Sequence, residues 1–351
     1  MRVPLINILK FILVCFIVTS AAANDYSADK VLNRFVWESP VDGFDNGGYD
    51  ASVQKLFQAY EQAAQTELKP GERSRVGIKV YTSSGPGLAT PQPLVLAVVK
   101  ALESRGFQRS DIFLVDEKAS MLQDAGYLGP VKTNAPEFEG IPVYALDTQR
   151  YFDPIWFYEN NLPSKEKLAR SIRDTRLSYR ADPDERKSFL PLPLIADAEF
   201  WINLPMVSDM PGIMVNGALS NATLWNISNN KRFFDSPANA SVAMAEIAGI
   251  PELKQRWVFS ILTLERYQYM GGPFFNARYT KTEPKLWLSA NPIALDALML
   301  RRINYARQQD GFPVFEEVPP YFEYTQGIGY GPYEIGELQL RRVVTAEPPS
   351  E

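Results

Sequence analysis

The spacing of apolar side chains along the chain predicts its secondary structure. In residues 52–66 they recur every three to four positions, which is typical of one face of an amphipathic helix. Pro70-Gly71 is expected to end that segment, and residues 24–50, which contain three glycines and Pro40, are expected to be irregular. The apolar positions of the helix are Val53, Leu56, Phe57, Tyr60 and Ala64.

The clearest unit is a strand, a helix and a second strand. Val76–Tyr81 is apolar enough for a buried strand, and Ile112–Asp116 is a second one. Between them, a loop of small residues leads into a helix over 91–105, for which Thr90 is the expected N-cap. This spacing predicts a right-handed βαβ unit in a parallel sheet.

Further elements alternate along the rest of the chain. Residues 257–266 fit a strand or a buried helix equally well, because their apolar run has no decisive period. The alternation predicts an α/β fold, with a mostly parallel or mixed sheet flanked by helices in a single large domain over 24–345 and a tail at 346–351. The other expected strands are 141–145, 198–204, 286–289 and 338–344, and the other expected helices are 164–180, 239–249 and 292–307.

The first 23 residues have the features of a secretory signal peptide. Arg2 and Lys10 flank the start, an apolar run covers 11–18, and small residues at 20–23 fit an Ala-x-Ala cleavage site. We expect cleavage after Ala23 and export to the periplasm or beyond, with no membrane span in the mature chain. A retained anchor is the alternative, but the apolar run is shorter than the roughly 20 residues that a spanning helix needs.

The composition excludes several chemistries. The chain has no histidine, and its single cysteine, Cys15, lies in the leader. We therefore expect no haem ligation by histidine, no iron–sulfur cluster, no zinc site built from Cys and His, and no Ser-His-Asp catalysis. Removing two basic residues with the leader changes the net charge from −5 to 34 minus 41, or −7, which argues against nucleic acid as a partner.

Several short motifs resemble a known family. Residues 76–91, 200–205 and 217–221 come first, and Met270-Gly-Gly-Pro273 then precedes an Asp-containing segment over 287–296. In this order they resemble the domain of unknown function 362 family, over roughly residues 75–345. The resemblance implies an α/β fold and no settled activity. The chain differs from many relatives, because it lacks their cysteine cluster and carries Met206, Ser208 and Met210 where they have lysines and a histidine.

The first candidate site is the loop after the first predicted parallel strand. Open α/β sheets bind ligands outside the carboxyl ends of their strands, and backbone N–H groups at a helix start favour an anion. The alternative is a tight turn whose hydroxyls cap the helix. The candidate residues are Ser83, Ser84, Gly85 and Gly87.

Polar residues also follow the other predicted strands. Asp116 and Glu117 end one strand and offer a base or, with Asp209, an oxygen-ligand site for a hard cation. Either group could instead be a solvated surface carboxylate. The amide and hydroxyl candidates, which could read a polar ligand or fill turns, are Asn203, Ser208, Asn216 and Asn221.

Two more candidates lie in the C-terminal half. Glu265 precedes Gly271 and Gly272, which suggest a backbone that approaches a ligand closely, although a structural ion pair with Arg266 is the alternative. Asp296 lies early in a predicted helix, where it would complement the helix dipole or bind a metal.

Three functions remain open at this point. The first is binding of a small polar or anionic ligand at the carboxyl ends of the strands. The second is a histidine-free hydrolase or transferase that uses carboxylates and a divalent cation, which requires Asp116, Asp209 and Asp296 to converge. The third is a cell-envelope scaffold without a ligand.

Overall fold

A mixed nine-stranded sheet forms the centre of the molecule in the computed structural model, which describes residues 32–130, 135–148, 150–162 and 183–343. The expected signal peptide, the helix over 164–180 and the tail lie outside the described residues. The strand order is β15 (Gln339–Arg342), β1 (Phe35–Pro40), β14 (Lys285–Ser289), β11 (Trp257–Thr263), β8 (Phe200–Asn203), β2 (Val76–Lys79), β3 (Ile112–Asp116), β5 (Ile141–Ala145) and β4 (Glu137–Phe138).

The middle of the sheet is parallel and its margins are mixed. Strands β11, β8, β2, β3 and β5 run in one direction, so their carboxyl ends share one edge. β14 is antiparallel to both of its neighbours, and β4 is antiparallel to β5. The predicted α/β class and the single large domain with a mixed sheet are confirmed.

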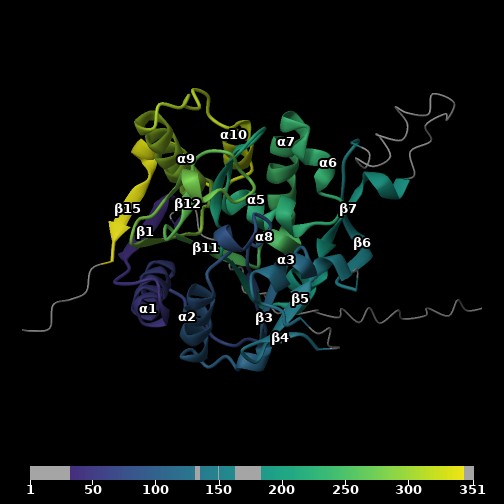
Figure 1. Cartoon of the computed structure of the whole chain (residues 1–351). Coiled ribbons are helices and arrows are strands. Elements are labelled where there is room, and N and C mark those ends of the chain that lie inside the picture. The colour runs from purple at the N-terminus through teal and green to yellow at the C-terminus, as the bar shows by residue number, and fades with distance from the viewer. Residues whose placement is uncertain (1–31, 131–134, 149, 163–182, 344–351) are drawn as a thin grey trace, which may run out of the picture.

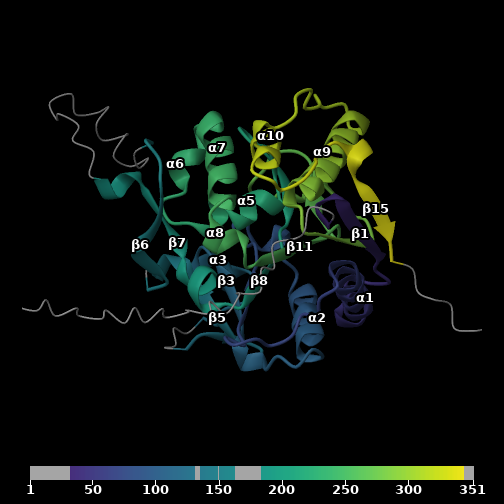
Figure 2. The ribbon, with the colours of Figure 1, turned by 180° about the vertical axis from the view of Figure 1, so that it is seen from behind.

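Helices cover both faces of this sheet (Figures 1 and 2). α1 (Asn46–Ala64) and α2 (Gln92–Glu103) lie on one face, while α5 (Ala218–Ala222), α7 (Pro237–Ala248), α9 (Pro292–Gln309) and α10 (Pro320–Gly327) lie on the other. Alternate residues of a strand supply the two cores, because successive side chains point to opposite faces. In β3, Ile112 and Leu114 pack in the core with α1 and α2, and Phe113 and Val115 pack in the core on the other face.

Short elements sit beside the main sheet. A four-stranded sheet has the order β10 (Met214–Asn216), β9 (Val207–Met210), β12 (Tyr267–Gln268) and β13 (Thr280–Lys281). β6 (Phe152–Glu159) and β7 (Lys187–Pro191) form an antiparallel pair on the same side of the molecule as β3 and β5 (Figures 1 and 2). Three short helices also belong to the described part of the chain: α3 (Ala119–Asp124), α6 (Lys231–Phe234) and α8 (Pro251–Lys254).

Some expectations about individual elements are corrected. The segment expected to be irregular contains β1 and the start of α1, whose N-cap Asp45 accepts a hydrogen bond from Gly48 N at 2.9 Å. Thr90 does not cap α2: its hydroxyl accepts from Tyr81 N at 2.8 Å and donates to Leu204 O at 2.7 Å. In the ambiguous run at 257–266, residues 257–263 form a strand, β11.

Candidate functional site

A buried ion pair joins the carboxyl ends of β2 and β3. Lys79 Nζ lies 2.6 Å from Asp116 Oδ1 and donates to Val80 O at 2.7 Å and to Asn221 Oδ1 at 2.9 Å. Thr82 Oγ1 donates to the second oxygen of Asp116 at 2.6 Å. Both charged side chains are fully buried, and burial lowers the pKa of Lys79 while Asp116 opposes that change.

Asparagines extend this network across the sheet. Asn221 Nδ2 donates to Asn203 Oδ1 at 2.8 Å, and Asn203 donates to Ser260 Oγ at 3.0 Å and to Ala218 O at 2.9 Å. These groups are buried and bonded to one another, so they position β8, β11 and α5. The structure brings Asp116, Asn203 and Asn221 together as predicted, but as part of the interior.

A second buried network holds the loop after β2. Tyr81 OH lies 2.7 Å from Ser84 Oγ and accepts from Asn216 Nδ2 at 2.8 Å. Asn216 Oδ1 accepts from Trp225 Nε1 at 2.6 Å and from Ser220 Oγ at 2.8 Å. Ser84 and Asn216 thus fix the loop to α5 and β10, and their polar atoms are used within the fold.

Asp209 holds the glycine turn that follows β12. Its Oδ1 accepts from Gly272 N at 2.8 Å, and its Oδ2 accepts from Gly271 N at 3.2 Å and from Arg307 Nη2 at 2.8 Å. A Cβ at Gly272 would lie 1.9 Å from the carbonyl oxygen of Asp209 and 2.9 Å from Ser208 Oγ. Close backbone approach therefore requires glycine here, although what it approaches is β9 itself.

Asp296 caps a helix other than its own. Its carboxylate accepts from Ala218 N at 2.6 Å and Leu219 N at 3.1 Å at the start of α5, and Tyr321 OH lies 3.3 Å away. Burial raises the pKa of Asp296 to about 7, against the opposing effect of these hydrogen bonds. Asp296 lies early in α9, as expected, and its hydrogen bonds connect α9 to the start of α5.

Glu265 and the two loop glycines also have partners within the fold. Glu265 accepts a hydrogen bond from Tyr49 OH at 2.6 Å, and burial raises the pKa of Tyr49 well above its usual value. Gly87 lies against the ring of Phe275, and its carbonyl accepts from Arg266 Nη1 at 2.7 Å. Gly85 has a positive φ of 95°, which the turn into the following segment requires.

The three aspartates of the metal hypothesis have separate sets of partners. Asp116 binds Lys79, Asp209 binds Arg307, and Asp296 binds the start of α5. Within the described residues, no group of three or more acidic side chains is placed to hold a metal ion. The geometry therefore gives these carboxylates structural contacts rather than a shared cation.

A pocket of about 460 Å³ opens where β3 and β5 end; we call it the strand-end pocket. Pockets of this size hold small organic ligands. Glu117 follows β3, Leu146 and Asp147 follow β5, and β6, β7 and the asparagine-rich segment close the other sides. The lining residues are Glu117, Leu146, Asp147, Phe152, Pro154, Phe189, Ile227, Ser228 and Asn229.

Glu117 is the most unusual polar group in this pocket. Its side chain is 13% exposed, and its Oε2 oxygen is buried and accepts no hydrogen bond from the described residues. Its other oxygen lies 3.7 Å from Lys118 Nζ. Burial raises the pKa of Glu117, with Lys118 opposing that change, and a perturbed carboxyl in a cleft is typical of functional sites.

Local hydrogen bonds position the pocket walls. Asp147 N donates to Glu117 O at 2.8 Å, and Asp147 Oδ1 accepts from Ala119 N at 3.1 Å, so the two strand ends are tied together. Ser228 N donates to Phe189 O at 3.1 Å, and Ser228 Oγ accepts from Phe189 N at 2.7 Å, so the asparagine-rich segment is bonded to β7. The pocket is therefore a defined part of the fold.

Sequence reasoning found the edge of the sheet but missed most of the pocket lining. The sequence predicts Glu117, together with Asp116, as a base or cation ligand at the end of a strand, and Asp147 follows a predicted strand in the same way without having been a candidate. Phe152 and Phe189 gave no signal, because they belong to a hairpin with no short turn. Ser83, a predicted ligand residue, lies in the loop that follows β2, the strand paired with β3. Its hydroxyl is buried and has no hydrogen-bond partner among the described residues.

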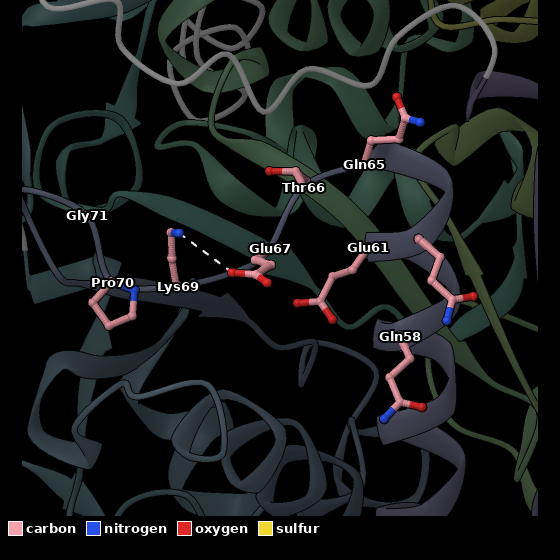
Figure 3. A pocket seen from close by; sticks show the side chains of 9 residues that line it. Gln58, Glu61, Gln65, Thr66, Glu67, Lys69, Pro70 and Gly71 are labelled. Atoms are coloured by element: carbon pink, nitrogen blue, oxygen red, sulfur yellow. Dashed lines mark ion pairs between the residues drawn. The ribbon is translucent and has the colours of Figure 1, made fainter.

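A larger hollow elsewhere has a different character. The α1 groove, about 760 Å³, lies at the end of α1 and is lined by Gln58, Glu61, Gln62, Gln65, Thr66, Glu67, Lys69, Pro70 and Gly71. Figure 3 shows its side chains, including the ion pair of Glu67 and Lys69 at 3.6 Å. Because most of these side chains are polar and solvated, this groove offers little apolar surface to a ligand.

Comparisons with protein families, with curated proteins and with solved structures found no match for this chain. The resemblance to the domain of unknown function 362 family therefore stays a prediction. No helix among the described residues is long and apolar enough to cross a membrane.

Proposed function

We propose that this protein binds a small organic molecule in the strand-end pocket, with a polar group of the ligand facing Glu117. The observation that carries the proposal is Glu117, which lines a cavity of ligand size and whose buried Oε2 oxygen has no hydrogen-bond partner among the described residues. An unpaired buried oxygen costs free energy, and a ligand donor would remove that cost.

The chemistry of the walls refines the earlier expectation of a polar or anionic ligand. The described lining residues include two carboxylates and two phenylalanines, and none of these described residues is Lys or Arg. Such a pocket favours a polar ligand with an apolar ring or chain over an anion. The proposed site lies at the same edge of the sheet as the predicted one. Its proposed ligand contacts are at the ends of β3 and β5 rather than in the loop after β2.

Export of the mature chain and its relation to the domain of unknown function 362 family are parts of the same proposal. The apolar leader before Ala23 supports export, and the order of the motifs from 76 to 296 supports the relation. Binding in the strand-end pocket depends on neither of them.

A screen of single-ring compounds tests the proposed function. Neutral, cationic and anionic members of the panel are mixed with the full chain, and binding is detected by ligand-observed NMR. Ser228→Tyr places a ring in the strand-end pocket, while Thr66→Tyr makes a comparable change in the exposed α1 groove. We expect hits that bind wild type and Thr66→Tyr but not Ser228→Tyr. Failure of the whole panel, or equal binding to both variants, contradicts the proposal.

A further inference from the structure

The strand-end pocket combines negative charge with aromatic walls. Glu117 and Asp147 supply the carboxylates, and Phe152 and Phe189 lie with ring centroids 6.4 Å apart at a tilt of 41°. Ring faces and carboxylates both attract cations. Resting on the proposed function, we infer that the ligand of this pocket is an organic cation, an amine with an apolar body.

The carboxylates have unequal surroundings. Asp147 is exposed, so its carboxylate is solvated, and its Oδ1 accepts a hydrogen bond from Ala119 N. Glu117 is mostly buried, with 13% of its side chain exposed, and its Oε2 oxygen accepts no hydrogen bond from the described part of the chain. An ammonium group placed there forms a charge-assisted hydrogen bond, which is stronger than a bond between neutral groups.

The other charged groups around Glu117 do not neutralise its carboxylate as a bound cation would. Lys118 lies on the same segment, 3.7 Å from Oε1, and is partly exposed, so solvent weakens its effect. Asp116 and Lys79 also act on Glu117, but they neutralise each other within their buried pair. Asn230 contributes a hydrogen bond from its amide and carries no charge.

Binding of a cation is therefore linked to the ionisation of Glu117. Burial raises the pKa of this carboxyl in the free protein, so it holds its proton to a higher pH than an ordinary glutamate does. A bound ammonium favours the ionised form and releases the proton. The affinity for a cation should rise with pH through the pKa of Glu117, whereas the affinity for a neutral compound should not.

Three probes with the same ring separate charge from shape. Benzylamine, benzyl alcohol and benzoate are titrated into the full chain by ligand-observed NMR between about pH 5 and pH 8. The variant is Glu117→Gln, which removes the charge and keeps the shape. The control is Glu67→Gln, which removes one charge in the α1 groove, where the side chain is 80% exposed.

We expect the affinity for benzylamine to be at least about tenfold higher than that for benzyl alcohol, and the affinity for benzoate to be the lowest of the three. Glu117→Gln should abolish that preference and the pH dependence while leaving benzyl alcohol binding unchanged, and Glu67→Gln should match wild type. If benzyl alcohol binds as well as benzylamine, the cation inference is overturned and the pocket still binds ligands. If none of the three binds, the inference is overturned together with the proposed function.

Discussion

At the scale of single residues, polar groups that resemble a catalytic set are largely interior contacts. Asp116, Asn203 and Asn221 lie together at the strand ends, but their donors and acceptors are bonded to one another. The sequence locates such residues because they follow apolar strands. It does not show that Lys79, inside a strand, binds Asp116, because apolar spacing predicts the two strands but not which partner a buried lysine takes.

Asp296 gives the sharpest prediction at this scale. Its pKa of about 7 exceeds the usual 3.8, so the folded protein holds a proton that the unfolded chain releases between these values. The free energy of unfolding contributed by this group is therefore largest below about pH 4 and falls as the pH rises to 7, by a few kcal/mol at most.

The measurement compares wild type with Asp296→Asn by urea unfolding at acid and neutral pH. The amide cannot accept from both Ala218 N and Leu219 N, so the variant should be less stable, by about 1–3 kcal/mol in acid. Its deficit should shrink as the pH rises, because it lacks the titration of the carboxyl. A deficit that stays constant between pH 4 and pH 7 contradicts the assigned protonation.

At the scale of elements, local pattern predicts the βαβ unit but not the small sheets. β2, α2 and β3 follow from apolar spacing, because neighbouring strands in the chain are also neighbours in the sheet. β1 escapes prediction, since its partners β14 and β15 lie more than 240 residues away. The β6–β7 hairpin escapes for a similar reason: a long insertion separates its two strands.

The link between the four-stranded sheet and α9 depends on Arg307. Its guanidinium donates to Asp209 Oδ2 and Tyr269 O, both at 2.8 Å, and to Pro313 O at 3.0 Å. Lysine has one nitrogen and cannot reach three acceptors with this geometry. We expect Arg307→Lys to lower the free energy of unfolding by on the order of 2 kcal/mol.

Hydrogen exchange locates the effect of Arg307→Lys. The amides of Gly271 and Gly272 donate to Asp209, so they should exchange faster when Asp209 loses its partner. Arg301→Lys, on the exposed part of the same helix, is the control and should leave both amides unchanged. Unaltered exchange in Arg307→Lys would mean that Asp209 holds the turn without the arginine.

At the scale of the whole molecule, the sequence predicts an α/β fold with a mixed sheet, and the structure confirms it. Parallel strands bring their carboxyl ends to one edge, and the strand-end pocket lies there. The walls could not be predicted in the same way, because they come from segments separated by up to 112 positions, from Glu117 to Asn229. Only the folded sheet places these segments together.

The most direct test of ligand binding is protection of a single thiol at the pocket rim. Cys15 is the only cysteine of the chain, so Cys15→Ser combined with Pro154→Cys leaves one thiol beside the strand-end pocket. Cys15→Ser combined with Glu67→Cys leaves one thiol in the α1 groove.

Alkylation of both proteins is followed by mass spectrometry with and without benzylamine or benzyl alcohol. The account predicts that at least one compound slows alkylation at position 154 and leaves position 67 unchanged. Equal rates at position 154 with and without both compounds would contradict binding in the strand-end pocket.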